Sequence, residues 1–249
     1  MRAVDLVLYA AWAFAVAFAG GLVGLVLGNM RLPATLLVSS SAGAGTGANL
    51  LVSAAAAATA AIVHVRAGRI NWRLFGWMLP PSIVFAVLGG YVSGVLPRTP
   101  LLLAIAAVLI VSGVQLLGWQ PVADRARSGL DLPAAVLSGA VVGFLGGLVG
   151  LILGSLRMPA LLRLVGEAPS SAAGVNVAVG FWVGIAGALG HLPSTAPDWT
   201  VAGVGAAASV PGALLGSRLT GRLTEPQLVR TIGVVIIVAG CATVVEAFA

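Results

Sequence analysis

Two arginines occur in matching and unusual surroundings in this sequence. Residues 28–33 read GNMRLP and residues 154–159 read GSLRMP, so a long apolar run ends each time in glycine, a short polar residue, arginine and proline. Arginine inside an apolar segment costs about 2.5 kcal/mol or more on insertion scales, and it usually faces protein or water. Arg31 and Arg157 are therefore candidates for holding a negatively charged ligand.

The proline in each stretch predicts a break in the helix. Proline disfavours helix at the residue before it and starts helices well, so we expect short second helices to begin at Pro33 and Pro159. Irregular backbone at membrane depth is tolerated only where it is buried in protein or lines a cavity. A helix restarting there points free N–H groups and a positive dipole end into that cavity. Together with the arginine charge, this favours an anion.

Short polar residues near the two breaks are suited to complete such a site. Asn49 and Asn176 occupy equivalent positions inside apolar runs, where hydrogen bonding between helices is the structural alternative. For the arginines, the alternative is an interface position from which they reach lipid headgroups. The candidate substrate-binding residues are Gly28, Asn29, Arg31, Pro33, Thr46 and Asn49 in the first half, and Gly154, Ser155, Arg157, Pro159, Ser171 and Asn176 in the second.

The two histidines, His64 and His191, are also equivalent, and each ends an apolar run beside a loop. Interface histidines are common at such places, and a proton relay is the functional alternative. No Asp or Glu lies in the middle of an apolar run, and no cluster of Cys, His and carboxylates indicates a metal site. No nucleophile–base pair indicates catalysis. The sequence therefore predicts no enzyme activity, metal or cofactor.

The elements that position these residues are predicted to be membrane-spanning helices. The chain has 249 residues, of which 59% are hydrophobic and 8% charged, against about 25% charged in soluble domains. A bilayer core needs roughly 20 apolar residues per helix. The net charge of +6 comes from arginines scattered between apolar runs, which is typical of membrane-protein loops and not of a nucleic-acid surface. Eight runs are long enough: 5–28, 43–65, 72–96, 100–119, 132–154, 170–192, 199–223 and 226–248.

The chain contains two copies of one segment. Residues 20–34 and 146–160 are identical at eleven of fifteen positions. The register continues to Asn71 and Asp198, each of which directly precedes a tryptophan and predicts a helix N-cap. We expect an all-α polytopic membrane protein with about eight hydrophobic helical segments in two homologous repeats with broken helices. The repeats would span residues 1–119 and 132–249, joined by a polar linker at 120–131.

Arginine is distributed differently in equivalent loops. By the positive-inside rule, such loops would lie on opposite sides of the membrane, which favours inverted repeats. Inversion needs an odd number of crossings per half, so one segment, most simply the broken one, would be re-entrant. A parallel four-plus-four arrangement is the alternative. The loop after the second run contains Arg66, Arg69 and Arg73, whereas the equivalent loop between His191 and Asp198 contains no arginine. The loop after the third run contains only Arg98, whereas its equivalent is flanked by Arg218, Arg222 and Arg230.

The duplicated glycine-rich helix, the proline after it, the segment with Asn49 or Asn176 and the passage from histidine to tryptophan resemble the TauE/SafE family of sulfite exporters. Members of that family typically show GxGGG followed by proline. Here the outer glycines are Gly24 and Gly28, and Gly150 and Gly154. The inner glycines are replaced by Val26 and Leu27 in one half, and by Ile152 and Leu153 in the other.

The resemblance covers essentially the whole chain. It implies transport of a small sulfur oxyanion, such as sulfite or an organosulfonate, across the cytoplasmic membrane of a prokaryote. We therefore expect a secondary transporter that binds one anion between the repeats at the paired breaks, with a passive anion channel as the alternative. The expected partners are the anionic substrate and the lipid bilayer, without nucleic acid. Assembly as a homo-oligomer, the exact substrate, the direction of transport and the coupling ion stay open.

Overall fold

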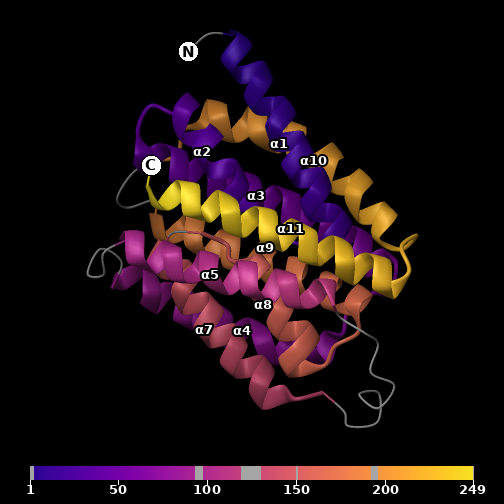
Figure 1. Cartoon of the computed structure of the whole chain (residues 1–249). Helices are drawn as coiled ribbons and strands as arrows, with labels where there is room; N and C mark the ends of the chain where they lie inside the picture. The colour runs from indigo at the N-terminus through magenta and orange to yellow at the C-terminus, as the bar shows by residue number, and fades with distance from the viewer. Residues whose placement is uncertain (1–2, 93–97, 119–129, 150, 192–195, 249) are drawn as a thin grey trace.

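The computed structural model describes residues 3–92, 98–118, 130–149, 151–191 and 196–248, and these ranges contain helices and no strand (Figure 1). Eight of the described helices are long and apolar enough to cross a membrane, which confirms the expected polytopic all-α fold. The first half contains α1 (Ala3–Val23), α2 (Gly28–Val38), α3 (Ala42–Arg66), α4 (Trp72–Tyr91) and α5 (Arg98–Leu117). The second half contains α7 (Leu132–Val149), α8 (Gly154–Ala160), the π-helical turn η1 (Leu161–Val165), α9 (Pro169–His191), α10 (Trp199–Thr220) and α11 (Glu225–Ala247).

The predicted N-caps at the start of α4 and α10 are confirmed. Asn71 Oδ1 accepts from Leu74 N at 3.1 Å, and Asp198 Oδ1 accepts from Val201 N at 3.1 Å. These bonds satisfy N–H groups that the first turn of a helix leaves without partners. Most of the predicted linker, namely residues 120–129, lies outside the described residues, as does Gly150.

The most extensive helix contacts join the two halves of the chain. Helix α1 packs along α10, α4 along α7, and α5 along α11. Figure 1 shows the indigo N-terminal helix beside the orange α10, and α4 beside α7. Since α7 and α10 are the counterparts of α1 and α4, the first helix of each repeat packs against the fourth helix of the other. The repeats therefore interleave.

Small residues allow α1 and α10 to approach closely. A Cβ on Gly21 would lie only 2.6 Å from the carbonyl oxygen of Ala213, and close packing of this kind holds helices together in lipid. Ser209 Oγ donates to Ala13 O at 3.3 Å, and Thr220 Oγ1 donates to Gly21 O at 3.0 Å. Residue numbers rise together on the two helices, so α1 and α10 run parallel.

Equivalent helices, in contrast, run antiparallel where they meet. On α3 and α9, Gly184 lies against Ala54, whereas Gly187, further along α9, lies against Leu50, earlier on α3. Helices α5 and α11 cross in the same antiparallel sense. Both labelled chain ends lie in the upper left of Figure 1, at the same end of the bundle. The arrangement places the centre of α3 and the centre of α9 side by side in the middle of the molecule.

The break in the first helix lies earlier than the sequence predicted. Helix α1 ends at Val23, residues 24–27 form a non-helical link, and α2 begins at Gly28. Pro33, at which the second helix was expected to start, is the sixth residue of α2, so that prediction was wrong. The physical reason is Gly24, whose φ of +67° is a left-handed conformation that ends helices.

The second half repeats this geometry. Helix α8 begins at Gly154 and contains Pro159 as its sixth residue, so the expectation of a helix start at Pro159 was wrong as well. In both halves the glycine, the short polar residue and the arginine therefore belong to the first turn of the second helix. The N–H groups without a partner in the helix are those of the glycine and the short polar residue, whereas Arg157 N donates to Leu153 O at 3.2 Å.

Candidate functional site

The first turn of α2 directs Arg31 towards α3. Arg31 Nε donates to Asn49 Oδ1 at 3.0 Å, and Nη2 donates to Asn49 O at 3.2 Å and to Ser53 Oγ. Asn49 Nδ2 in turn donates to Gly28 O at 3.0 Å, which ties the start of α2 to α3. The side chain of Arg31 is 2% exposed. These bonds fix the plane of a buried guanidinium group.

Arg157 occupies the equivalent place in α8, with fewer contacts. Its Nη1 donates to Asn176 Oδ1 at 3.3 Å, and its Nε has no hydrogen-bond partner among the described residues. The side chain is completely buried. Asn176 Nδ2 donates to Gly154 O at 3.1 Å and to Gly24 O at 2.8 Å. Asn176 therefore joins the breaks of both repeats.

Both guanidinium groups are buried among neutral partners. Asn49 and Ser53 accept from Arg31 and Asn176 accepts from Arg157, and no carboxylate of the described residues contacts either group. Their burial excludes the alternative in which the arginines reach lipid headgroups. A buried charge without a counter-charge is costly, because neutral hydrogen bonds replace only part of its hydration. The arrangement is therefore incomplete in a way that an anion would remedy.

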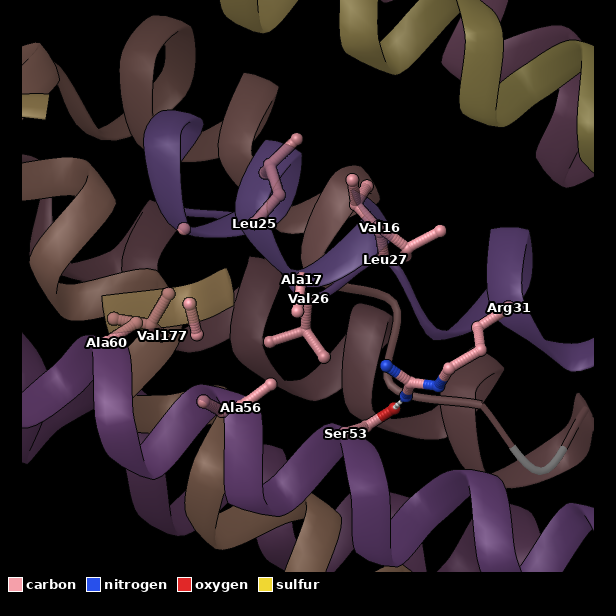
Figure 2. Close-up of a pocket in the computed structure, with 13 residues that line it drawn as sticks. Val16, Ala17, Leu25, Val26, Leu27, Arg31, Ser53, Ala56, Ala60 and Val177 are labelled. Atoms are coloured by element: carbon pink, nitrogen blue, oxygen red, sulfur yellow. Dashed lines mark hydrogen bonds between the residues drawn. The ribbon is translucent and has the colours of Figure 1, made fainter. Parts of the chain in front are cut away.

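A small cavity lies at the end of the Arg31 side chain (Figure 2). Its walls are α1, the link residues Leu25, Val26 and Leu27, and a run of alanines on α3. Figure 2 shows the guanidinium reaching from α2 to Ser53, with Val26 on the cavity side. The volume of about 10 Å³ is room for about one water molecule. In this conformation the cavity is therefore too small to hold an oxyanion.

The hydrogen bonds of Arg31 leave one nitrogen for a ligand. Nε and Nη2 are used by Asn49 and Ser53, whereas no hydrogen bond to a described residue uses Nη1. The cavity is otherwise lined by apolar side chains and Ser53. A charge-assisted hydrogen bond made there would be strong, since no water competes for it.

Several of the remaining candidate residues lie away from the cavity or bond to neighbouring helices. Asn29 Nδ2 donates to Thr243 Oγ1 at 3.0 Å and to Ala239 O at 3.2 Å, which ties α2 to α11. Its counterpart Ser155 is buried, and its hydroxyl has no partner among the described residues. Thr46 Oγ1 donates to Ala42 O of its own helix at 3.0 Å. The cavity at Arg31 is not lined by Thr46, Ser171, Pro33 or Pro159.

His64 is buried, contrary to the expectation of an interface position. Its side chain has 0% exposure, and neither ring nitrogen has a hydrogen-bond partner in the described part of the chain. It lies one helical turn beyond Ala60, which lines the cavity. His191 ends α9, and its side chain is outside the described residues. Within those residues, no group of three or more His, Cys, Asp or Glu side chains is placed to hold a metal ion.

Ser53 is the site residue that sequence reasoning missed. It follows Asn49 by four residues and so lies on the same face of α3. The four-residue spacing from Asn49 was the available signal. Comparison of the two repeats did not reveal Ser53, because the equivalent residue in α9 is Gly180. A residue present in one copy only does not stand out when the two copies are compared.

Each half of the chain contains one break and one buried arginine. The match to a known family also covers both halves. A family model described as "Sulfite exporter TauE/SafE" matches residues 9–243. The chain belongs to the TauE/SafE family. It is thus a multi-pass membrane protein of that family, and the resemblance predicted from the sequence is confirmed.

A bacterial relative supports the TauE/SafE assignment. The protein named "Probable membrane transporter protein YunE" of Bacillus subtilis (strain 168) is 34% identical over 110 residues. That match covers 43% of this TauE/SafE chain and 39% of the relative's length. No solved structure matches the chain.

Two departures from the TauE/SafE pattern lie in the centre of the bundle. Val26 replaces an inner glycine and packs against α9, where a Cβ on Gly180 would lie 2.8 Å from Val26 Cγ2. Ile152 packs in the same way, and a Cβ on Gly184 would lie 2.6 Å from its Cδ1. Both side chains are buried, at 4% and 3% exposure. These larger side chains fill the space that the glycines of α9 leave beside the two breaks.

Proposed function

We propose that this protein is a secondary transporter of a small anion, namely sulfite, an organosulfonate or a related sulfur oxyanion, bound between the repeats at the paired breaks. One observation carries the proposal. Arg31 is buried and lines a cavity, its hydrogen-bond partners are neutral, and no described residue bonds to its Nη1. The family name and the bacterial relative support a location of the protein in the cytoplasmic membrane of a prokaryote.

Each residue of the site has a distinct role in this proposal. Arg31 neutralises the anion and donates to one of its oxygens through Nη1. Asn49 and Ser53 hold the guanidinium plane, so that little reorganisation accompanies binding. Arg157 and Asn176 take the corresponding part when the second repeat is exposed. Because the hydrogen-bond partners of the guanidinium groups are neutral, their positive charge is not neutralised until the anion binds.

The helix directions support inverted repeats. A twofold axis in the membrane plane relates segments that run antiparallel, as α3 and α9 do. Inverted repeats place a substrate at their interface near the midplane and alternate its exposure when one repeat rocks against the other. In that scheme, α2 and α8 are the re-entrant segments. The closed cavity at Arg31 is the occluded stage of such a cycle.

The test is flux of labelled sulfite and small sulfonates into proteoliposomes. We expect uptake by the wild-type protein and a loss of about 100-fold or more with Arg31→Gln, because the buried charge faces the anion directly. Arg163→Gln is the matched control, since Arg163 lies outside the cavity and bonds to Gln115. Uptake by Arg31→Gln at the wild-type rate would contradict the proposal.

Two further measurements define the cargo and the mode of transport. A thermal-shift screen against sulfite, sulfate, thiosulfate and small sulfonates identifies the cargo, because a ligand that binds only the folded state stabilises it. Planar-bilayer recording separates a carrier from a channel. A carrier turns over too slowly to give unitary currents, so single-channel steps would replace the alternating-access mechanism with a passive pore.

A further inference from the structure

A groove of about 540 Å³ lies on the outer side of α4, away from the arginine site. Volumes of this size are typical of pockets that hold an organic ligand. The groove follows one face of the helix for two turns and is closed on the other side by Val136 of α7. Its α4 residues are Trp72, Arg73, Gly76, Trp77, Pro80 and Pro81.

The groove is polar at one end and apolar at the other. Arg73 lies in the first turn of α4, where the helix begins. The proline pair Pro80–Pro81 lies about 12 Å further along the axis, at 1.5 Å per residue. Trp72 and Trp77 flank the groove at 59% and 53% exposure, and tryptophan is enriched where membrane meets water. This polarity is that of a phospholipid, with its charge at the water end.

The charge at the polar end is free to bind a ligand. Arg73 is exposed and forms no hydrogen bond or ion pair with any residue in the described ranges. Arg66 and Arg69 precede it within seven residues, so the loop before α4 is cationic. Such loops are typical of the cytoplasmic face, whose leaflet carries anionic lipids.

The second repeat lacks this groove chemistry. At the equivalent positions in α10, Arg73 becomes Thr200 and Trp77 becomes Val204, and two alanines, Ala207 and Ala208, stand in place of the proline pair. The next residue is serine in both copies, Ser82 and Ser209. The two helices therefore differ at the groove positions and agree at the serine that follows them. The difference is therefore confined to the lipid-facing side of one repeat.

We propose that this groove binds an anionic phospholipid, whose phosphate pairs with Arg73 while its glycerol and upper acyl chain lie over Gly76 between Trp77 and the proline pair. A second copy of the chain fits less well, because an exposed arginine at the rim would lose water without gaining a counter-charge. The bound lipid would fix α4, and with it the α4–α7 pair that joins the two repeats.

The test is titration of delipidated protein with phosphatidylglycerol and with phosphatidylcholine, with bound lipids counted by native mass spectrometry. We expect tighter binding of phosphatidylglycerol, and about a fivefold loss of its affinity with Arg73→Gln. Gly76→Leu should remove binding of both lipids by filling the groove, because a Cβ at Gly76 meets no atom within 4 Å and the fold can accept it.

Gly203→Leu is the matched control. Gly203 is the counterpart of Gly76 in α10, and a Cβ there also meets nothing within 4 Å. We expect wild-type lipid binding from this variant. Equal affinity for the two lipids, equal losses from Gly76→Leu and Gly203→Leu, or a disulfide from Trp77→Cys to a second chain would each overturn the lipid assignment.

Discussion

The two buried arginines have the same sequence context but different surroundings. Arg31 is held by Asn49 and Ser53 and ends at a cavity, whereas Arg157 bonds only to Asn176 among the described residues, and its Nε has no partner there. Both copies therefore have the charge and the asparagine, but only the first has the serine that also bonds to the guanidinium. The first repeat has a guanidinium that is already oriented, and the second has one that is not.

A single position accounts for much of this difference. The counterpart of Ser53 is Gly180, which offers no hydroxyl group, and its space is filled by Val26 from the first break. The link of one repeat thus closes the site of the other. An anion at Arg31 would require that link to move, which would also release the packing on Gly180. In the proposed transport cycle, this shared packing would couple the two sites.

The largest expected effect is a difference in anion affinity between variants of the two arginines. Arg31→Gln should weaken anion binding about 100-fold or more, since it removes the charge that faces the cavity. Arg157→Gln should change the affinity by less than about threefold in this conformation, because Arg157 does not line the cavity at Arg31. Titration calorimetry on purified variants measures both values. Equal losses would show that the asymmetry has no bearing on binding.

A smaller effect is expected from the hydroxyl that only the first repeat has. Ser53→Ala should reduce anion affinity about fivefold to tenfold, because Arg31 loses an acceptor that holds its plane. The double variant Gly180→Ser with Val26→Ala supplies the missing hydroxyl to Arg157 and removes the side chain that would clash with it. Calorimetric titration of this double variant should show a second anion site, and an unchanged single site would argue against Gly180 as the cause of the asymmetry.

The smallest effect concerns stability. Asn29 ties α2 to α11 through two hydrogen bonds, whereas the hydroxyl of its counterpart Ser155 has no partner among the described residues. Asn29→Ala should lower the free energy of unfolding by about 1 kcal/mol. Ser155→Ala should leave it unchanged or raise it slightly, because the hydroxyl is buried without a bond. Unfolding in detergent mixtures measures both, and a larger loss from Ser155→Ala would reveal a partner for that hydroxyl.

Much of this fold could be predicted from the sequence, because the signals were long-range and repeated. The eight apolar runs correspond to eight helices of membrane-spanning length, and the shared context of Arg31 and Arg157 identified the two buried charges. The caps at Asn71 and Asp198 were readable because a short polar residue before an apolar run has one common structural use.

The features that escaped prediction depend on single residues or on distant contacts. The link at residues 24–27 is as apolar as the helix before it, so hydropathy carried no sign of the break, and Gly24 resembled the packing glycines around it. Pro33 was the more visible signal, and it misplaced the start of α2. The interleaving of α1 with α10 is a contact between residues almost 200 positions apart, which no local pattern encodes.

The most direct test of an anion site at Arg31 is a crystal structure with selenite, an oxyanion of the same shape as sulfite whose selenium scatters anomalously. We expect one selenium peak in the cavity, with an oxygen within about 2.7–3.2 Å of Arg31 Nη1, and a displacement of the link at Val26 and Leu27 that makes room for it. No selenium in the core of a protein that transports sulfite, or a peak at Arg157 alone, would contradict the assignment of the site.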